Sequence, residues 1–142
     1  MDYAEQLGPT LAETARAWRF CLDRRLKPLG LSRAKWMVLA HLSKSSDGLV
    51  QKELACRLGI EGPTLVGLLD RMSHDGWIER RPFGGDRRSK TVHLTDKAKS
   101  IADDIHATAA TLRQELLEGI SEQDLELCVR VLQRLKSKAE VL

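Results

Sequence analysis

Apolar residues recur at three- and four-residue steps along much of this chain, which is the spacing of one face of an amphipathic helix. The first such series ends near Pro28 and Gly30, residue types that terminate helices. Its apolar members are Leu7, Leu11, Ala15, Trp18, Leu22 and Leu26. The spacing predicts an N-terminal helix within residues 1–30.

A second helical series follows Ser32, a residue type that caps helix N-termini well. The polar, glycine-containing run 45–48 ends this series as a turn. The apolar face consists of Trp36, Leu39, Ala40 and Leu42. The pattern therefore predicts a shorter helix between Ser32 and the turn.

The pattern after Gln51 is typical of a helix-turn-helix. Ala55 is small enough to let two helix backbones approach, and Gly59, four positions later, allows the sharp turn. Pro63 falls near the first turn of the second helix, where a missing N–H costs little. The apolar residues that seat both helices are Leu54, Leu58, Ile60, Leu65 and Leu68. A generic helical hairpin is the alternative interpretation.

Alternating apolar and polar residues flank a Pro-Phe-Gly-Gly turn and predict a β-hairpin over Arg80 to Lys90. This segment holds five basic residues and one acidic residue. Taken alone, it is either a ribbon that carries cations to a nucleic acid or a solvated charged loop. Its position directly after a helix-turn-helix gives the element order of a winged helix and favours the first interpretation.

Two further amphipathic helices are predicted after Thr95, and Ser121 with Asp124 resembles a capping box that opens the second. Three long helices cannot bury their apolar stripes on so small a core, which predicts a twofold homodimer. The expected fold is mainly α with a small β-hairpin. A winged helix-turn-helix core, residues 31–94, is flanked by dimerisation helices in residues 1–30 and 95–142.

Basic and acidic residues are distributed unevenly along the chain. The chain has 142 residues, which suits one domain, and its net charge is +3. Residues 1–94 carry 16 basic and 11 acidic residues, whereas residues 95–142 carry 7 and 9. The positive side therefore belongs to the winged part, which suits double-stranded DNA as a partner.

Other classes of function are not indicated. No apolar run is long enough to span a membrane, the N-terminus lacks signal-peptide features, and three separated cysteines suit a reducing cytoplasm. The four histidines form no ligand cluster in sequence, so neither a metal nor another cofactor is expected. No nucleophile motif, phosphate loop or carboxylate pair is present, which argues against an enzyme.

The chain resembles the MarR family of bacterial transcription regulators, and closely its SlyA branch. The most specific match is the wing sequence Asp86-Arg87-Arg88-Ser89-Lys90. Further matching segments are residues 25–29, 34–36, 58–61, 63–66, 69–70, 94–95 and 97–98. The resemblance implies a cytoplasmic, nucleoid-associated regulator that binds a pseudo-palindromic, AT-rich operator and acts as a repressor or an anti-silencing activator.

The resemblance also implies a DNA interface. Arg88 is expected to enter the minor groove and Asp86 to hold the shape of the wing, while the recognition helix enters the major groove. Gly67 stands where SlyA-like relatives carry an Arg. This protein is therefore expected either to depend on wing contacts and DNA shape more than its relatives do or to read a different operator. The expected DNA-binding residues are Pro63, Thr64, Val66, Gly67, Arg71, Arg81, Asp86, Arg87, Arg88 and Lys90.

An effector site is a further implication, because family members bind small aromatic or phenolic acids between their dimerisation and DNA-binding parts. Arg16 and Arg19 match positions near that pocket and would receive a carboxylate, and Trp36 would stack on a ring. The alternative is that Trp36 belongs to the core and that both arginines are solvated.

Two other functions stay open at this level. The first is a winged-helix module whose basic wing binds an acidic protein. The second is a thiol-based redox regulator that uses Cys21, to which Arg24 and Arg25 lie near in sequence. Cys56 and Cys128 are expected to be packing residues.

Overall fold

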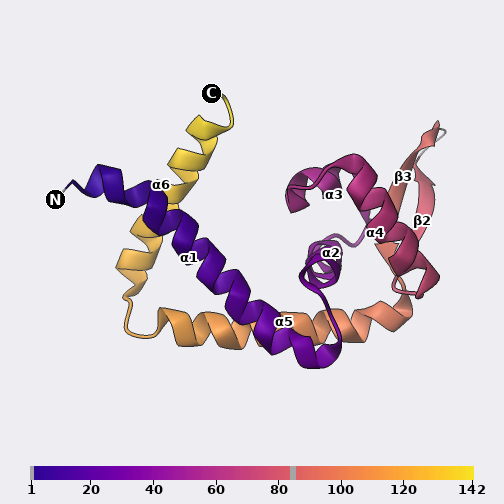
Figure 1. The fold of residues 1–142 in the computed structure, drawn as a ribbon, viewed down its shortest axis with the longest axis horizontal. Coiled ribbons are helices and arrows are strands. Elements are labelled where there is room, and N and C mark those ends of the chain that lie inside the picture. The colour runs from indigo at the N-terminus through magenta and orange to yellow at the C-terminus, as the bar shows by residue number, and fades with distance from the viewer. Residues whose placement is uncertain (1, 84–85) are drawn as a thin grey trace. The chain divides into compact units, whose positions relative to one another are not determined.

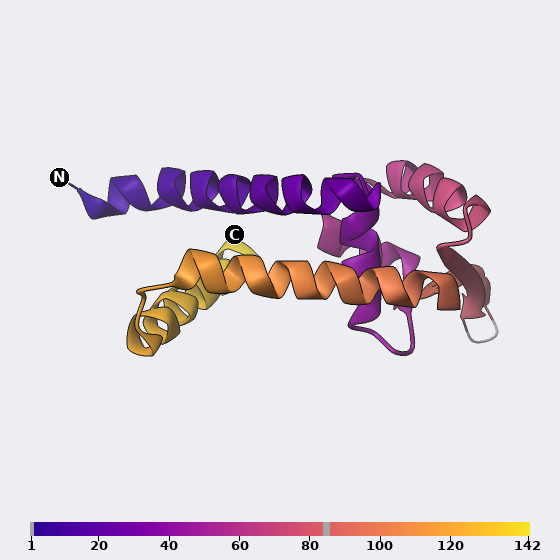
Figure 2. The same ribbon diagram turned by 90° about the horizontal axis from the view of Figure 1, so that it is seen from below.

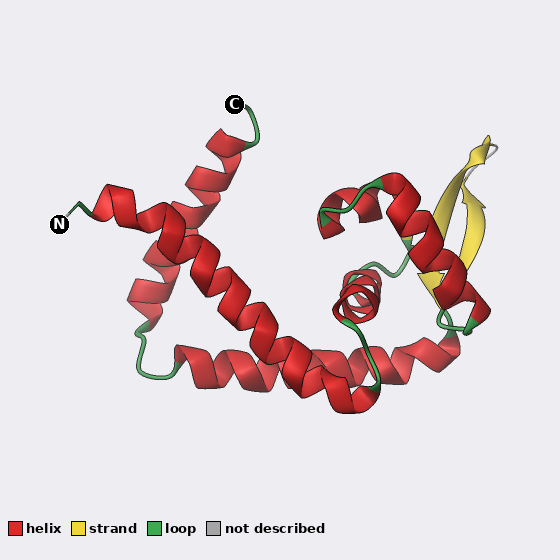
Figure 3. Ribbon diagram, in the orientation of Figure 1, coloured by secondary structure: helices red, strands yellow, loops and turns green. Residues whose placement is uncertain are grey.

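The computed structural model describes residues 2–83 and 86–142, with side chains for residues 2–82 and 90–142. This part of the chain contains six α-helices, one short 3-10 helix and a three-stranded antiparallel sheet (Figures 1 and 3). The predicted fold class, a mainly α protein with a winged helix-turn-helix core, is confirmed. The chain divides into two compact units, residues 1–110 and 111–142.

The N-terminal helix α1 (Tyr3–Leu26) begins at Asp2, whose carboxylate accepts a hydrogen bond from the Ala4 amide at 2.8 Å. It continues into the 3-10 helix η1 (Lys27–Leu29) and ends at Gly30, which has a φ of 75°. Pro28 lies inside η1, so the predicted stop is confirmed. Figure 2 shows α1 as one continuous helix that extends well past the winged core.

Helix α2 (Arg33–Ser43) is capped by Ser32, as the sequence predicts. Its first turn is joined to α1 through one carboxylate. Asp23 accepts hydrogen bonds from the indole N–H of Trp36 and from Nε of Arg33, each at 2.8 Å. The Arg33 hydrogen bond, followed by that of Trp36, keeps the pKa of Asp23 below its usual value despite partial burial.

The helix-turn-helix consists of α3 (Gln51–Leu58) and α4 (Gly62–His74). Gly59 adopts a φ of 67°, and its N–H reaches the carbonyls of Ala55 and Cys56. A left-handed residue at this point ends α3 and redirects the chain, as predicted from Ala55 and Gly59. Pro63 lies in the first turn of α4, also as predicted. Cys56, in contrast, is exposed, so its predicted packing role is wrong.

The wing is the antiparallel pair β2 (Ile78–Phe83) and β3 (Asp86–Leu94). Its register runs from Ile78 opposite Leu94 to Phe83 opposite Asp86. A two-residue strand, β1 (Leu49–Val50), adds to the other edge of β3, which the sequence did not indicate. Gly48, with a φ of 75°, allows β1 to pair with β3. A Cβ there would lie 2.6 Å from the Val92 carbonyl oxygen and from the His93 ring.

Buried aliphatic side chains from every element of the winged part form its core. Helix α5 (Asp96–Leu117) begins directly after the wing and is held there by two residues. The Thr95 hydroxyl donates to the Gly76 carbonyl at 2.6 Å, and the Lys97 ammonium lies 4.4 Å from the centre of the Trp77 ring. Fully buried members of the core include Leu26, Val38, Leu39, Leu54, Leu65, Leu69, Met72, Ile78 and Val92.

The second unit contains the end of α5 and α6 (Glu122–Ala139). Ser121 caps α6 by accepting a hydrogen bond from the Asp124 amide at 3.1 Å, which confirms the predicted start. Within one copy of the chain, α6 exposes much of its apolar surface, including 58% of Leu127 and 51% of Val129. Cys128 is exposed as well, so the expectation that it packs is wrong for a single copy.

Candidate nucleic-acid interface

Helix α4 has one buried face and one free face. Leu65, Leu68, Leu69 and Met72 are buried and hold the helix on the core. On the free face, Pro63, Thr64, Val66 and Arg71 are exposed, and Gly67 is half-buried. Apart from Asp70, which binds Arg80, the exposed residues from Pro63 up to Arg71 are small or uncharged. This face can enter a groove closely, but its side chains offer few hydrogen bonds to base edges.

The N-terminus of α4 is also free of a side-chain cap. Glu61 occupies the N-cap position but makes no side-chain hydrogen bond to the first turn. Backbone N–H groups at a helix N-terminus carry partial positive charge and bind phosphates well. The start of α4 therefore has the chemistry of a contact to a nucleic-acid backbone.

Arg80 connects the wing to α4. Its Nη1 donates to the Asp70 carboxylate at 2.7 Å, and its Nη2 donates to the Val66 carbonyl at 3.2 Å. Asp70 and Val66 both lie on α4, so one side chain fixes β2 against this helix. The Nε of Arg80 is buried without a hydrogen-bond partner among the described residues.

Arg80 was not among the predicted site residues, although a signal for it exists in the sequence. Side chains alternate between the two faces of a strand, so Arg80 shares a face with the buried Ile78. An arginine on the core-facing side of a strand requires hydrogen-bond partners inside the protein. That requirement, applied to β2, would have distinguished Arg80 from its neighbour Arg81.

Arg81 lies on the opposite face of the sheet. Its guanidinium binds the Glu79 carboxylate, with a distance of 2.8 Å from Nε. On the same face, Nε2 of His93 lies 2.7 Å from Oγ1 of Thr91. Burial, and then the charge of Arg81, lowers the pKa of His93 below its usual value. Among the described residues of this outer face, the cation Arg81 thus lies beside an imidazole whose pKa is lowered.

Lys90 brings a cation to the recognition helix. Together with Gln51, Val66, Asp70 and Arg80 it lines a cavity of about 330 Å³. A second cavity of about 450 Å³ shares Gln51, Val66 and Lys90 and continues along the start of α3 and α4. These cavities form a groove between α3, α4 and β3. The side chains of Asp86, Arg87 and Arg88 lie outside the described residues, although their backbone belongs to β3.

The predicted effector residues occupy different environments. Trp36 is only 8% exposed, belongs to the hydrophobic core and uses its indole N–H to bind Asp23. Arg16 and Arg19 are exposed on α1. The thiol of Cys21 is half-buried on the same helix.

Within residues 2–83 and 86–142, no group of three or more His, Cys, Asp and Glu residues is placed to hold a metal ion. The helices in this described part of the chain are too short or too polar to span a membrane.

Comparison with known proteins decides the family. Residues 29–89 match the MarR family model. The crystal structure of the transcriptional regulator PA3341 is 46% identical over 96% of this chain and 99% of that chain, with a TM-score of 0.90. The chain belongs to the MarR family. Members of this family are transcriptional regulators and not enzymes.

More distant MarR-type structures share the fold. The Staphylococcus aureus MepR–DNA complex matches with a TM-score of 0.80 at 22% identity, over 97% of this chain and 98% of that chain. CouR from Rhodococcus jostii RHA1, bound to p-coumaroyl-CoA, matches with a TM-score of 0.77 at 22% identity. That match covers 91% of this chain and 90% of CouR. At this identity the likeness concerns the fold alone.

Proposed function

We propose that this MarR family member is a homodimeric, sequence-specific DNA-binding regulator of the SlyA-like branch. The observation that carries the proposal is the groove in which the free face of α4, the start of α3 and Lys90 of the wing come together. Its operator is a pseudo-palindromic, AT-rich duplex in the bacterial nucleoid. The protein acts there as a repressor or as an anti-silencing activator.

Each element of the interface contacts a different feature of the DNA. Helix α4 enters the major groove with Pro63, Thr64, Val66 and Gly67, and its uncapped N-terminus binds a phosphate. The wing enters the minor groove through Arg88, with Asp86 holding its shape. The remaining cations bind the phosphate backbone and are Arg71, Arg81, Arg87 and Lys90. The MepR–DNA complex, which shares the fold, supports DNA as the partner of this fold.

The exposed apolar residues support a dimer. Leu7, Leu11 and Phe20 of α1 are 41%, 42% and 58% exposed, and α6 exposes Leu127 and Val129 in the same way. Apolar surface of this extent on helices mainly serves association. A twofold dimer would cover it and would present two wings and two recognition helices to the two halves of an operator.

A small aromatic or phenolic acid is the proposed effector, and it releases the protein from DNA. CouR, a protein of this fold, was crystallised with p-coumaroyl-CoA, the thioester of a phenolic acid, which supports a ligand with a phenolic ring. In the proposed site, Arg16 and Arg19 receive the carboxylate. Trp36 contributes an aromatic wall, which its attachment to Asp23 holds in place.

Salt-dependent binding to duplex DNA tests the DNA function. Fluorescence anisotropy with an AT-rich pseudo-palindrome should show an affinity that falls steeply with salt, because each neutralised phosphate releases counterions. A GC-rich duplex of equal length serves as the control and should bind more weakly. Absence of duplex binding at low salt would exclude a DNA regulator and favour a module that binds acidic proteins.

A further inference from the structure

Helix α5 packs on the winged core along its first half. Among the described residues, the core takes Ala98 and Ile105 from this helix and no later residue. Ala102, which lies between them, is also buried. Apolar contacts are non-directional, and an alanine has no side chain beyond Cβ to interlock with its neighbours. These contacts hold α5 against the core, but they do not by themselves fix its direction.

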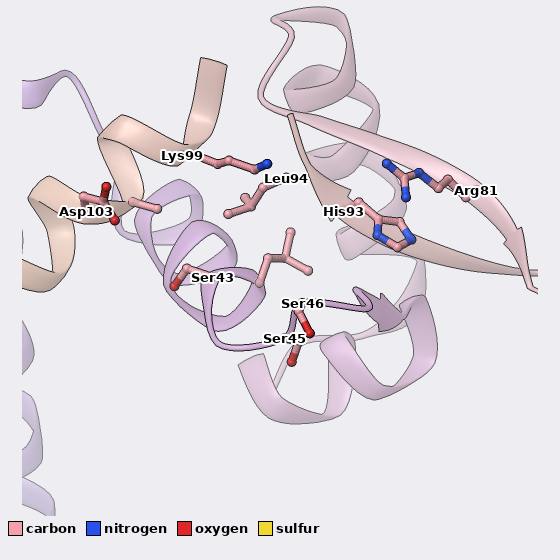
Figure 4. Close-up of a pocket in the computed structure, with 10 residues that line it drawn as sticks. Ser43, Ser45, Ser46, Arg81, His93, Leu94, Lys99 and Asp103 are labelled. Carbon is pink, nitrogen blue, oxygen red and sulfur yellow. The ribbon is translucent and has the colours of Figure 1, made fainter. Parts of the chain in front are cut away.

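A directional contact follows directly after Ile105. The Ser43 hydroxyl, in the last turn of α2, donates to the Ala40 carbonyl at 2.7 Å and also contacts Nε2 of His106 on α5. A hydroxyl has one proton, which the carbonyl receives here, so Nε2–H of the imidazole donates to the hydroxyl oxygen. Figure 4, which looks into the adjacent cleft, shows the Ser43 hydroxyl pointing away from the sheet residues Arg81 and His93.

Helix α2 is thereby held at both ends. Its first turn is bound to α1, where Asp23 accepts hydrogen bonds from Arg33 and Trp36 at 2.8 Å each. Its last residue is bound to α5 through His106. The buried face of α2 belongs to the core, so α2 and the winged core move together. A body that is held at two separate points cannot swivel about either of them.

We propose that His106 is a positioning residue for DNA binding: through Ser43 it sets the angle between α5 and the winged core. In the dimer, this angle determines the separation of the two recognition helices. This role rests on the proposed function, a dimer that binds DNA. A tilt of about 10° displaces a point ten helical residues away by about 3 Å, because each residue rises about 1.5 Å. Neighbouring base pairs are about 3.4 Å apart, so such a tilt misplaces a recognition helix by almost one base pair.

The distance between spin labels on the two protomers, measured by pulsed electron paramagnetic resonance without DNA, tests this role. Cys56 is exposed on α3 and takes the label after Cys21→Ser and Cys128→Ser. With His106 intact, the Cys56–Cys56 distance distribution should be narrow. His106→Leu removes the donor and should broaden the distribution by about 3–6 Å, which corresponds to a tilt of about 10° in each protomer. His106→Gln keeps an N–H donor near the place of Nε2 and should restore the narrow distribution.

Further variants separate the hydrogen bond from packing. Ser43→Ala removes the acceptor and should broaden the distribution as His106→Leu does, and the double variant should add nothing. Lys99→Gln is the matched control, because it breaks a 3.0 Å ion pair with Asp96 within α5, and it should leave the distribution narrow. Equal widths with and without the His106 donor would overturn the positioning role. Equal broadening in His106→Leu and His106→Gln would overturn it as well, since packing alone would then be responsible.

Operators whose half-sites are one base pair closer or further apart give the functional measurement. In anisotropy titrations, the wild-type protein should bind the matched operator about tenfold or more tightly than these two. His106→Leu should lower this ratio to about threefold, whereas a loss of stability alone would weaken binding to all three operators equally. An unchanged ratio would contradict the role of His106.

Failure of the proposed function would give different results. A wild-type protein without any Cys56–Cys56 distance would exclude the dimer, and the positioning role with it. A distance that depends on His106, in a protein that binds none of the operators, would support the hydrogen bond as the determinant of the angle and would overturn only the DNA function.

Discussion

The recognition helix and the wing of this protein differ in chemistry although they lie side by side. Helix α4 exposes Thr64 and Val66 and has a glycine at position 67, so its first two turns offer no cationic side chain. The wing sequence from Arg80 to Lys90 holds five basic residues. A helix face of this kind fits a groove by shape, whereas guanidinium groups respond to phosphate charge and minor-groove width. Recognition is thus expected to depend more on the wing.

Loss of a wing arginine is the largest expected effect. Arg88→Ala should reduce the affinity for most duplexes by about 1–3 kcal/mol, because a groove contact and its counterion release are lost together. Anisotropy titrations at several salt concentrations measure both the affinity and the salt slope. Arg130→Ala, which removes an exposed arginine from α6, is the control and should leave both unchanged. An unaltered affinity in Arg88→Ala would mean that the wing does not enter the groove.

A cation added to α4 should reduce the contrast between the two regions. Gly67→Arg should raise the affinity for duplexes with a guanine at the facing position by about 1–3 kcal/mol. There is room for a side chain, since a Cβ at Gly67 would only reach ordinary contact distance, 3.6 Å, from Arg71. A panel of operators with single base changes measures the preference.

The matched control is Gly67→Ala, which adds helix propensity without a donor. It should raise the free energy of unfolding by about 0.5–1 kcal/mol and leave DNA affinity almost unchanged. If Gly67→Arg shows no gain over Gly67→Ala on any operator, this face of α4 does not contact base edges.

The link between the two regions can be broken at Arg80. Arg80→Ala removes the bonds to Asp70 and to the Val66 carbonyl, and we expect a loss of about 1 kcal/mol in unfolding free energy because Asp70 is largely exposed. DNA affinity should fall as well, because the wing loses its fixed position. Asp70→Asn and the double variant complete a thermodynamic cycle. Additive losses would show that the two residues act independently.

Acid should have the smallest effect, through three groups that lie on α1, α2 and β3. Burial is the main cause that lowers the pKa of both His41 and His93 below the ordinary 6.5 in the folded chain. As pH falls below 6.5, the histidines of the unfolded chain are protonated before those of the folded chain. The contribution of both histidines to the free energy of unfolding is therefore complete above pH 6.5 and is lost as pH falls through the lowered pKa values. Asp23, whose pKa is also lowered, should cause a second decline below its ordinary 3.8.

Urea unfolding at a series of pH values measures both decreases in the free energy of unfolding. His93→Gln should remove part of the first decline and leave the second in place. An identical pH profile in wild type and His93→Gln would contradict the lowered pKa of His93.

Local signals in the sequence were sufficient to predict much of the fold. Gly59, Pro63, Ser32 and Ser121 each act within one turn of their own position, and the structure places all four as predicted. The strand β1 gave no signal because two residues cannot show an alternation. Its pairing depends on Gly48 and on the distant Val92, which only the folded chain brings together.

The site was less predictable because its residues act across elements. The basic run between β2 and β3 was visible, but the opposite roles of Arg80 and Arg81 depend on which face of β2 meets α4. Exposure of Cys56 and Cys128 likewise follows from which helix faces find partners within one copy. The contact of Ser43 with His106 joins two elements that are far apart in sequence, and no continuous motif indicates it.

The Arg80 bond to α4 has a consequence for how such a regulator changes its target over evolution. Because Arg80 fixes the base of the wing against the recognition helix, we expect a constant distance between the two proposed DNA contacts of one half-site. New operators are then reached by substituting base pairs, whereas inserted or deleted base pairs separate the contacts and are not tolerated. Operator length should therefore vary much less than operator sequence among regulators that retain this arginine–aspartate pair.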